Sequence, residues 1–274
     1  MLKQRIITAV ILAAVFFTAL FGLPTFYFAI AALVALMTAV YEWGKLAGLR
    51  PGAGLAYAGA VLVIGALTFL YAGFDPAVGF PPKPVLILCG AAAAFWIVIA
   101  PLWLKQGWTT RKTPLMVVLG AVLILALWMA MVQLHARSPW LLLAAMLVVW
   151  IADTAAYFAG RKFGRRKLAP VISPGKSWEG VYGGLLCVAL YAVLLLLFFP
   201  LAADPRVSRP PVIVAALVLA MVSVVGDLFE SWLKRQAGVK DSGNTLPGHG
   251  GVLDRIDALI PALPVATLLV LLMS

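Results

Sequence analysis

The sequence predicts an all-α, polytopic integral membrane protein with about nine transmembrane helices. Of its 274 residues, 64% are hydrophobic and only 11% are charged, whereas roughly 25% are charged in an ordinary globular domain. The mean hydropathy is +1.06. A chain of this composition cannot cover itself with polar surface, so we expect a lipid bilayer to surround it.

Nine apolar runs are each close to the roughly 20 residues that a helix needs to cross a bilayer. They fall at residues 5–22, 24–43, 55–73, 85–104, 115–134, 139–160, 178–200, 211–233 and 256–273. The first two are separated by little more than Gly22-Leu23-Pro24, which favours a tight helical hairpin. No small-residue cleavage site follows the first run before the second begins, so we interpret it as a retained helix.

The distribution of Lys and Arg predicts the orientation. With nine spans, the loops on the side of the N-terminus hold 17 of the 21 basic residues. Because positive residues accumulate in cytoplasmic loops, we expect the N-terminus and the loops 161–177 and 234–255 in the cytoplasm, with the C-terminus outside. The net charge of +11 then reflects this orientation and contact with anionic membrane lipids, and no nucleic-acid partner is expected.

The acidic residues divide the chain into two regions. Residues 1–140 contain only Glu42 and Asp75, and we interpret them as a scaffold of about five spans. Residues 141–274 contain the other acidic residues and form the predicted catalytic region of about four spans. Cys89 and Cys187 lie inside apolar runs, which favours small buried hydrophobic residues over a disulfide or a metal pair.

A carboxylate-bearing helix face is predicted near the end of the eighth run. Ionisable groups at membrane depth cost roughly 2.5–3.5 kcal/mol each, so each needs a reason. Asp227, Glu230 and Lys234 follow i, i+3, i+7 spacing, which places them on one helix face next to Ser231. An ion pair within the helix is one interpretation, and a metal-binding face is the other.

Asp254 and Asp257 repeat the i, i+3 spacing at the start of the last run. One aspartate at a helix start would be explained by the helix dipole, but two are harder to explain in this way. Carboxylates from two neighbouring helix ends suit Mg²⁺, which often shares its ligands with substrate phosphates. We therefore predict a magnesium site, with one cation or two, at Asp227, Glu230, Asp254 and Asp257. The His and Cys spacing of a zinc site is absent.

Glycines and cations near these carboxylates suggest phosphate binding. The sequences Gly248-His249-Gly250-Gly251 and Ser242-Gly243-Asn244 could bring backbone N–H groups to phosphate oxygens, although a simple turn is the alternative. Asp153 and Tyr157 share a helix face at i, i+4 spacing upstream, followed by a basic loop and the sequence SPGKSWEG. The side chains predicted to bind substrate phosphates or to cap the next helix are Ser173, Lys176, Glu179, Arg235, Lys240 and Arg255.

These motifs resemble a known family. The stretch from Ser231 to Asp257 reads S-W-L-K-R, then K-D-S-G, then L-P-G-H-G-G-V-L-D-R-I-D, and it resembles the signature of the phosphatidate cytidylyltransferases, or CDP-diacylglycerol synthases. The D-x-x-A-Y sequence at Asp153–Tyr157 and S-P-G-K-S-W-E-G at 173–180 are similar to that family as well. The resemblance is detailed over residues 150–257 and rests on hydropathy and length before them.

The resemblance implies a Mg²⁺-dependent transfer of CMP from CTP to phosphatidic acid, giving CDP-diacylglycerol and pyrophosphate for phospholipid biosynthesis. It implies a homodimeric transferase, which we place in a bacterial inner membrane with the active site facing the cytoplasm. The catalytic residues would be Asp227, Lys234, Asp241, His249, Asp254 and Asp257. The substrate-binding residues would be Asp153, Tyr157, Ser173, Lys176, Glu179, Ser231, Arg235, Lys240, Gly250, Gly251 and Arg255.

Two kinds of alternative stay open from the residues alone, and a third is disfavoured. A polyprenol kinase or a cytidylyltransferase for another lipid would use similar groups. A cation-coupled transporter would also place carboxylates in broken helices, but here the charges gather at the cytoplasmic ends and no inverted repeat is visible. CDP-alcohol phosphotransferases are disfavoured because their motif needs an Asp-Gly dipeptide, which this sequence lacks.

Overall fold

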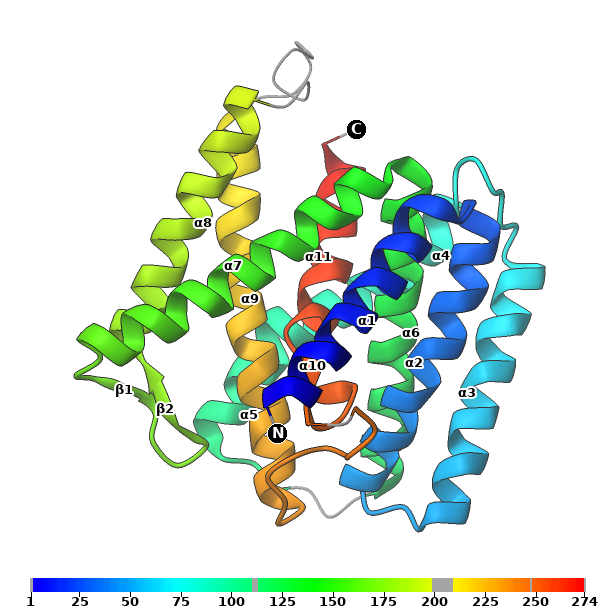
Figure 1. The fold of residues 1–274 in the computed structure, drawn as a ribbon. Helices are drawn as coiled ribbons and strands as arrows, with labels where there is room; N and C mark the ends of the chain where they lie inside the picture. The colour runs from blue at the N-terminus through cyan, green and yellow to red at the C-terminus, as the bar shows by residue number, and fades with distance from the viewer. Residues whose placement is uncertain (1, 110–112, 199–208, 247, 274) are drawn as a thin grey trace.

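The computed structural model describes residues 2–109, 113–198, 209–246 and 248–273 as a bundle of long helices (Figure 1). The helices are α1 (Leu2–Gly22), α2 (Thr25–Leu46), α3 (Pro51–Tyr71), α4 (Pro82–Ala94), α5 (Ala100–Gln106), α6 (Thr113–Arg137), α7 (Pro139–Phe163), α8 (Trp178–Phe198), α9 (Arg209–Gln236), α10 (Leu253–Ile256) and α11 (Leu259–Leu272). A π-helical turn, η1 (Phe95–Ile99), joins α4 to α5. Two strands, β1 (Lys167–Ala169) and β2 (Ser173–Ser177), form an antiparallel hairpin between α7 and α8.

The predicted all-α, polytopic class is confirmed. Within the described ranges, eight helical segments are long and apolar enough to cross a membrane: α2, α3, α4 to α5, α6, α7, α8, α9 and α10 to α11. The first predicted run forms α1, whose apolar stretch Ile7–Gly22 is shorter than these. The last two residues of the predicted run 178–200 lie outside the described residues.

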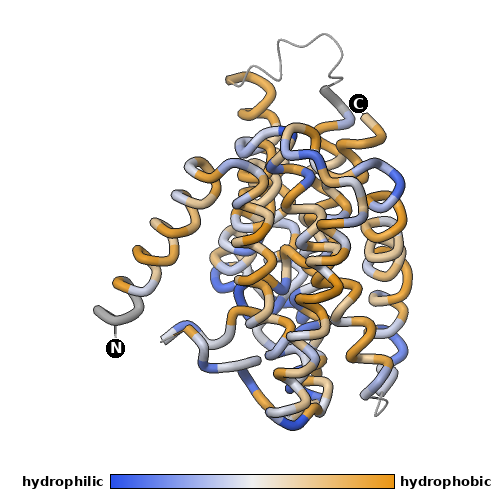
Figure 2. The backbone as a smooth tube through the Cα atoms, turned by 90° about the vertical axis from the view of Figure 1, so that its right-hand side faces the viewer, coloured by the Kyte–Doolittle hydropathy of each residue, from blue (hydrophilic) through white to orange (hydrophobic). Residues whose placement is uncertain are grey.

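The two ends of the chain lie at opposite ends of the bundle. Helix α1 begins at the end that carries the β hairpin and the segment between α9 and α10, whereas α11 ends at the other (Figure 1). Helix α1 leans away from the other helices (Figure 2). That the N-terminal end faces the cytoplasm remains a prediction.

Helix α6 and the span made of α10 and α11 lie at the centre of the bundle, with 61% and 56% of their spans buried. Two tryptophans fasten α2 to α6, because a buried indole N–H needs an acceptor. The Nε1 of Trp128 donates to the carbonyl of Ala29 at 2.8 Å, and the Nε1 of Trp43 donates to the carbonyl of Met116 at 2.7 Å. These bonds make α2 and α6 one frame.

Helices α7 and α8 approach closely along a seam of small residues. A Cβ atom on Gly184 would lie 2.9 Å from the carbonyl oxygen of Ala152, and one on Gly180 would lie 2.8 Å from that of Ala156. Such contacts let backbones pack where no water drives association. The hydroxyl of Ser177 accepts the N–H of Gly180 at 3.2 Å, so this serine caps α8. The seam therefore fixes the hairpin beside α7.

The helical hydrogen-bond pattern of the last span is interrupted near its start, although the backbone keeps right-handed helical angles there. Helix α10 ends at Ile256, Asp257 and Ala258 form a turn, and α11 begins at Leu259. Pro261 lacks the N–H that would bond to the carbonyl of Asp257 in an unbroken helix, which accounts for the break. The side chain of Asp257 consequently lies at a helix junction.

The two cysteines are both free, as expected. Cys89 is buried, but Cys187 is exposed, so the prediction of two buried residues is wrong for Cys187. It lies on α8, only 28% of whose span is buried, so much of this helix would face lipid. An apolar run in a membrane protein supplies lipid-facing positions as well as core positions, and a hydropathy pattern does not separate them.

Candidate active site

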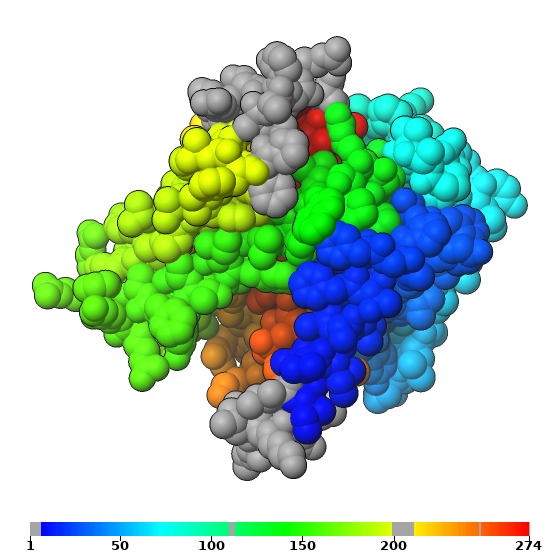
Figure 3. All heavy atoms as spheres, turned by 45° about the horizontal axis from the view of Figure 1, so that its top comes forward, coloured from blue at the N-terminus to red at the C-terminus, as the bar shows by residue number. Residues whose placement is uncertain are grey.

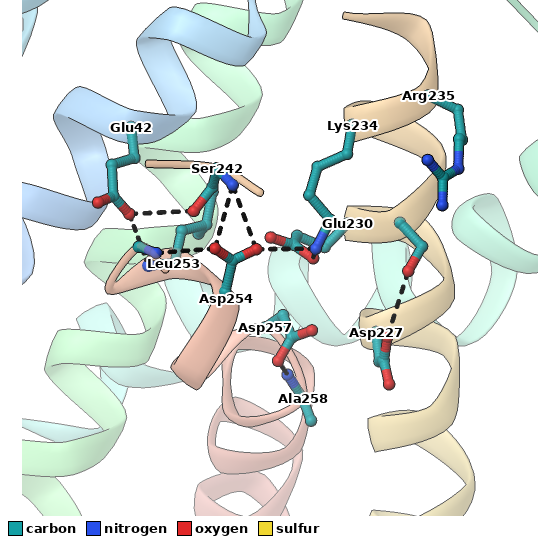
Figure 4. Close-up of polar contacts among 12 residues, drawn as sticks. Glu42, Asp227, Glu230, Lys234, Arg235, Ser242, Leu253, Asp254, Asp257 and Ala258 are labelled. Atoms are coloured by element: carbon teal, nitrogen blue, oxygen red, sulfur yellow. Dashed lines mark hydrogen bonds and ion pairs between the residues drawn. The ribbon is translucent and has the colours of Figure 1, made fainter. Parts of the chain in front are cut away.

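The predicted carboxylate face of α9 is present. The ammonium group of Lys234 forms ion pairs with Glu230, one turn earlier on the same helix, and with Asp254 from α10, where Nζ and Oδ1 are 2.8 Å apart. The interpretation of an ion pair within the helix is therefore confirmed, and Lys234 also pairs across to the next element, whereas the metal-binding interpretation stays a prediction. Figure 4 shows the carboxylates of Asp254 and Glu230 close to the Lys234 ammonium.

Asp254 holds the segment between α9 and α10 in place. Its carboxylate accepts the N–H of Ser242 at 3.0 Å and the N–H of Gly251 at 2.8 Å, in addition to the Lys234 ion pair. Hydrogen bonds to an ionised group are about twice as strong as neutral ones. These three partners therefore compensate most of the charge of Asp254 without a ligand.

The second predicted cluster lies against the first. The ammonium group of Lys176, on β2, is 2.5 Å from Oδ2 of Asp227 on α9. The hydroxyl of Ser231 donates to the other oxygen of Asp227 at 3.4 Å. Both partners of the ion pair retain about a quarter of their side-chain surface, 26% for Lys176 and 29% for Asp227. An incoming phosphate could therefore reach this lysine.

Asp257 lies beside this pair with few partners of its own. Its carboxylate is half-buried at the junction of α10 and α11 and accepts the N–H of Ala258 at 2.9 Å. It interacts electrostatically with Asp227, Lys176 and Asp153. Gly226 makes the approach possible, because a Cβ atom there would lie 2.5 Å from the carbonyl oxygen of Asp257. The glycine before Asp227 is thus needed for packing.

Glu230 is the most deeply buried carboxylate on α9, with 3% of its side-chain surface exposed. Apart from the ion pair with Lys234, neither of its oxygens has a hydrogen-bond partner in the described part of the chain. Glu230 therefore depends on the Lys234 ammonium to compensate its buried charge.

The donor set fits a magnesium ion in its chemistry. Four carboxylates, those of Asp227, Glu230, Asp254 and Asp257, gather around two lysines, Lys176 and Lys234. This leaves an excess of negative charge on oxygen atoms, which a hard divalent cation prefers. Among the described residues, no three side chains already converge as closely as a formed metal site would require. The two lysines lie between the carboxylates instead.

Several predicted residues lie around this cluster rather than in it. Glu179 accepts the backbone N–H groups of Arg165 and Arg166 and pairs with the Arg166 guanidinium at 3.4 Å, so it fastens the hairpin. Arg235 is exposed and donates to the carbonyl of Ile172 at 3.4 Å, which ties α9 to that hairpin. Ser173 begins β2.

The remaining predicted residues lie at the surface or in the segment before α10. The exposed ones are Asp153, Tyr157, Lys240, Asp241 and Arg255. The N–H of His249 donates to the carbonyl of Leu246 at 2.9 Å, and Gly250 takes a left-handed φ of 83°, so this part of the motif is a tight turn. Pro247, part of the family signature, lies outside the described residues.

Sequence reasoning missed one buried carboxylate that contacts this segment. Glu42, at the end of α2, was assigned to the scaffold, yet it accepts hydrogen bonds from Ser242, Val252 and Leu253. The signal was present in the sequence, since a lone acidic residue inside an apolar run needs a partner. The partner could not be identified, because it lies 200 or more positions away along the chain.

Fold and site together define a class: a polytopic membrane protein with a cluster of carboxylates and lysines at one end of its bundle. The chain belongs to the cytidylyltransferase family, whose model matches residues 3–273. The resemblance seen in the sequence is thereby confirmed.

Named relatives agree over nearly the whole length. The chain is 37% identical to the phosphatidate cytidylyltransferase of Haemophilus influenzae, covering 96% of each protein. It is 40% identical to that of Pseudomonas aeruginosa, over 97% of this chain and 95% of the relative. It is 37% identical to that of Brucella suis, over 95% of this chain and 90% of the relative.

Proposed function

We propose that this protein is a CTP:phosphatidate cytidylyltransferase of phospholipid biosynthesis. The observation that carries the proposal is the near-full-length similarity to relatives of that name. The geometry supports it, because two lysines lie among carboxylates at one end of a membrane bundle. The surface is hollowed between α7 and α1, with C-terminal segments at the bottom of the hollow (Figure 3). A lipid phosphate could enter by such a recess.

The reaction is a substitution at phosphorus. An oxygen of the phosphatidate phosphate attacks the α-phosphorus of CTP and forms a new P–O bond. The bond between the α-phosphorus and the oxygen leading to the β-phosphate breaks, and that oxygen keeps the electron pair, so pyrophosphate leaves. The products are CDP-diacylglycerol and pyrophosphate. Such transfers need mainly positioning and neutralisation of charge from the protein.

The lysines would bind the phosphates. Lys176 and Lys234 each hold a carboxylate partner that a phosphate oxygen could replace, so substrate binding would exchange one anionic partner for another. The exposed cations Arg235, Lys240 and Arg255 would attract the nucleotide to this end of the bundle. Asp153 and Tyr157, exposed on α7, would contact the lipid substrate.

The carboxylates would hold the metal. Asp227, Asp257 and Glu230 have the fewest fixed partners, and Asp254 would contribute from the opposite side. When bound, Mg²⁺ would neutralise charge on the phosphate oxygens and on the leaving pyrophosphate. The chain's own part is to keep these oxygens close together in a site from which lipid and helix exclude most water.

The proposal includes location and assembly. The protein would lie in a bacterial inner membrane with this end of the bundle in the cytoplasm, as the Lys and Arg distribution predicts. In a chain whose Cys89 and Cys187 have been replaced, a cysteine in place of Lys240 would then react with a membrane-impermeant reagent only from the cytoplasmic side. The protein would act as a homodimer, and light scattering of the purified protein would give twice the chain mass of 29.2 kDa.

The activity is tested with purified protein, labelled CTP and a metal series. We expect label to enter lipid only when both phosphatidate and Mg²⁺ are present, and chelation of the metal to stop it. Replacement of phosphatidate by diacylglycerol or a polyprenol is the control for substrate class. Incorporation without phosphatidate would contradict the proposal, as would ion flux in protein-containing vesicles without any CTP turnover.

A further inference from the structure

Glu42 connects the N-terminal helices to the family signature. This residue lies near the end of α2, and only 1% of its surface is exposed. Its Oε1 accepts the hydroxyl of Thr245 and, at 3.2 Å, the N–H of Val252. Its Oε2 accepts the hydroxyl of Ser242 at 3.2 Å and the N–H of Leu253 at 2.8 Å. All four partners belong to the segment 242–253, which we call the signature loop.

The signature loop wraps closely around this carboxylate. A Cβ atom on Gly243 would lie 2.5 Å from Oε1 of Glu42, and one on Gly251 would lie 2.5 Å from Oε2. Real side chains essentially never approach so closely, so both positions require glycine as long as Glu42 is in place. The close approach of Glu42 therefore explains why glycine occupies these two positions, which the sequence suggested for phosphate binding.

Ser242 carries the connection onward to the lysine of the cluster. Its hydroxyl donates to Glu42, and its N–H donates to Asp254 at 3.0 Å. Asp254 in turn pairs with Lys234, as Figure 4 shows. A chain of charge-assisted contacts thus runs from α2 through the signature loop to α9. Displacement of the loop would move Asp254 and Lys234.

The α2 end of this chain is fixed. Next to Glu42, Trp43 bonds to the carbonyl of Met116 on α6, and its indole fills the space beside Gly120, in which a Cβ atom would not fit. The hydroxyl of Tyr57 on α3 bonds to the carbonyl of Val117 at 2.9 Å. Side chains held by packing in this way hold a site more precisely than a free loop does.

We propose that Glu42 is a positioning residue of cytidylyl transfer, which holds the signature loop so that Asp254 and Lys234 lie where the substrate phosphates bind. The proposal rests on the proposed function and goes beyond it, because it assigns a role to the N-terminal helices, which otherwise serve as scaffold. Glu42 touches neither substrate nor metal in this account. It acts through the loop.

A carboxylate is required at this position, because both oxygens face donors. In Glu42→Gln, one oxygen becomes an NH₂ group. In either orientation of the amide that group meets a backbone N–H, that of Val252 or that of Leu253, and a backbone N–H cannot turn round to accept. The hydroxyls of Ser242 and Thr245 can rotate to accept a hydrogen bond from the amide, but a backbone N–H cannot. The variant therefore keeps the size of the side chain but loses a hydrogen bond to the backbone of the signature loop.

The test compares Glu42→Gln with the wild type and with Asp75→Asn. Asp75 is the other acidic residue of the N-terminal region and lies in an exposed turn, where it accepts the N–H of Ala77. We expect Glu42→Gln to lower kcat on the order of 10- to 100-fold, as small misplacements of catalytic groups do. We expect the KM for CTP to rise by a smaller factor than kcat falls, since Lys234 is displaced but Lys176 and the exposed cations remain. Asp75→Asn should leave both constants unchanged.

Hydrogen exchange supplies a readout that does not depend on activity. In Glu42→Gln the amides of residues 242–253 should exchange at least about tenfold faster, whereas those of α6 and α11 should not change. Unchanged kcat or unchanged exchange in the signature loop would overturn the proposal. So would faster exchange throughout the bundle, because Glu42 would then be a general stability residue.

Ser242→Ala provides the second variant if Glu42→Gln does not accumulate. It removes one hydroxyl contact to Glu42 and leaves the N–H to Asp254. A smaller fall in kcat with faster exchange confined to the loop supports the proposal, and wild-type values for both contradict it. A wild-type chain without CTP incorporation would refute the proposed function, and the exchange comparison would still decide whether Glu42 fastens the loop.

Discussion

At the scale of single residues, the carboxylates of this membrane protein differ in how completely they are satisfied. Glu42 accepts four hydrogen bonds from the signature loop, and Asp254 accepts two backbone N–H groups and a lysine. Asp257 accepts its neighbour's N–H, and Glu230 has its ion pair with Lys234. Because a buried charge needs compensation, Asp257 and Glu230, which have fewer partners, are the better candidates for binding a cation.

This difference predicts that substitution of Asp257 and of Asp254 lowers turnover in both cases but affects stability differently. Asp257→Asn should lower turnover at least about 100-fold but leave the midpoint of thermal unfolding unchanged or slightly raised, because removing a buried charge and its repulsion with Asp227 and Asp153 offsets the lost attraction to Lys176. Asp254→Asn should lower both turnover and stability, the latter by about 2 kcal/mol or more, because it weakens bonds that an ionised acceptor makes. Activity assays and unfolding curves in one detergent measure both.

Two outcomes would count against the assignment. Near-normal turnover in Asp257→Asn would remove Asp257 from the metal site. Equal losses of stability in the two variants would show that Asp257 is as structural as Asp254.

At the scale of elements, the site depends on helices that approach closely at small residues. The α7 and α8 seam fixes Ser177, which ends β2, and β2 carries Lys176 to Asp227. The turn at Asp257 depends on the missing N–H of Pro261 and on the small size of Gly226. The positions of the charged groups therefore depend on uncharged residues that the charge pattern does not reveal.

The seam predicts an unusual cost for a small substitution. In Gly183→Ala the new Cβ atom would overlap the Cβ of Ala159, so α8 must move away from α7. We expect a loss of about 1–3 kcal/mol in the free energy of unfolding, as for other overpacked positions. The matched control is Gly90→Ala in α4, where a Cβ atom meets nothing within 4 Å. That variant should be neutral or up to about 1 kcal/mol more stable, because alanine favours a helix.

Chemical unfolding of both variants in the same lipid or detergent decides between these expectations. If Gly183→Ala is as stable as Gly90→Ala, then α7 and α8 do not pack along this seam as described.

At the scale of the whole molecule, the sequence predicted the class of fold and the helix face that carries Asp227, Glu230 and Lys234. Hydropathy and helical spacing are local properties, and both survive in the structure. Contacts between distant parts were not predictable from them. Glu42 meets Leu253 across 211 positions, and Lys176 meets Asp227 from a hairpin in a stretch predicted to be a loop. Such pairs depend on how the helices pack.

The family resemblance indicated where the chemistry lies but could not separate residues by what they contact. Glu179 and Arg235 belong to matched or neighbouring motifs, yet in the structure they fasten the β hairpin. Gly243 and Gly251 accommodate Glu42. A motif records which residues occur together, and only packing shows which of them hold the loop and which face the cluster.

The fate of each phosphate of CTP tests the central claim most directly. Purified protein is given phosphatidate, Mg²⁺ and CTP labelled either at the α-phosphate or at the γ-phosphate. The account predicts that the α label enters lipid and the γ label is released as pyrophosphate. Transfer of the γ label to lipid would show a kinase instead, and release of both labels without lipid product would contradict cytidylyl transfer altogether.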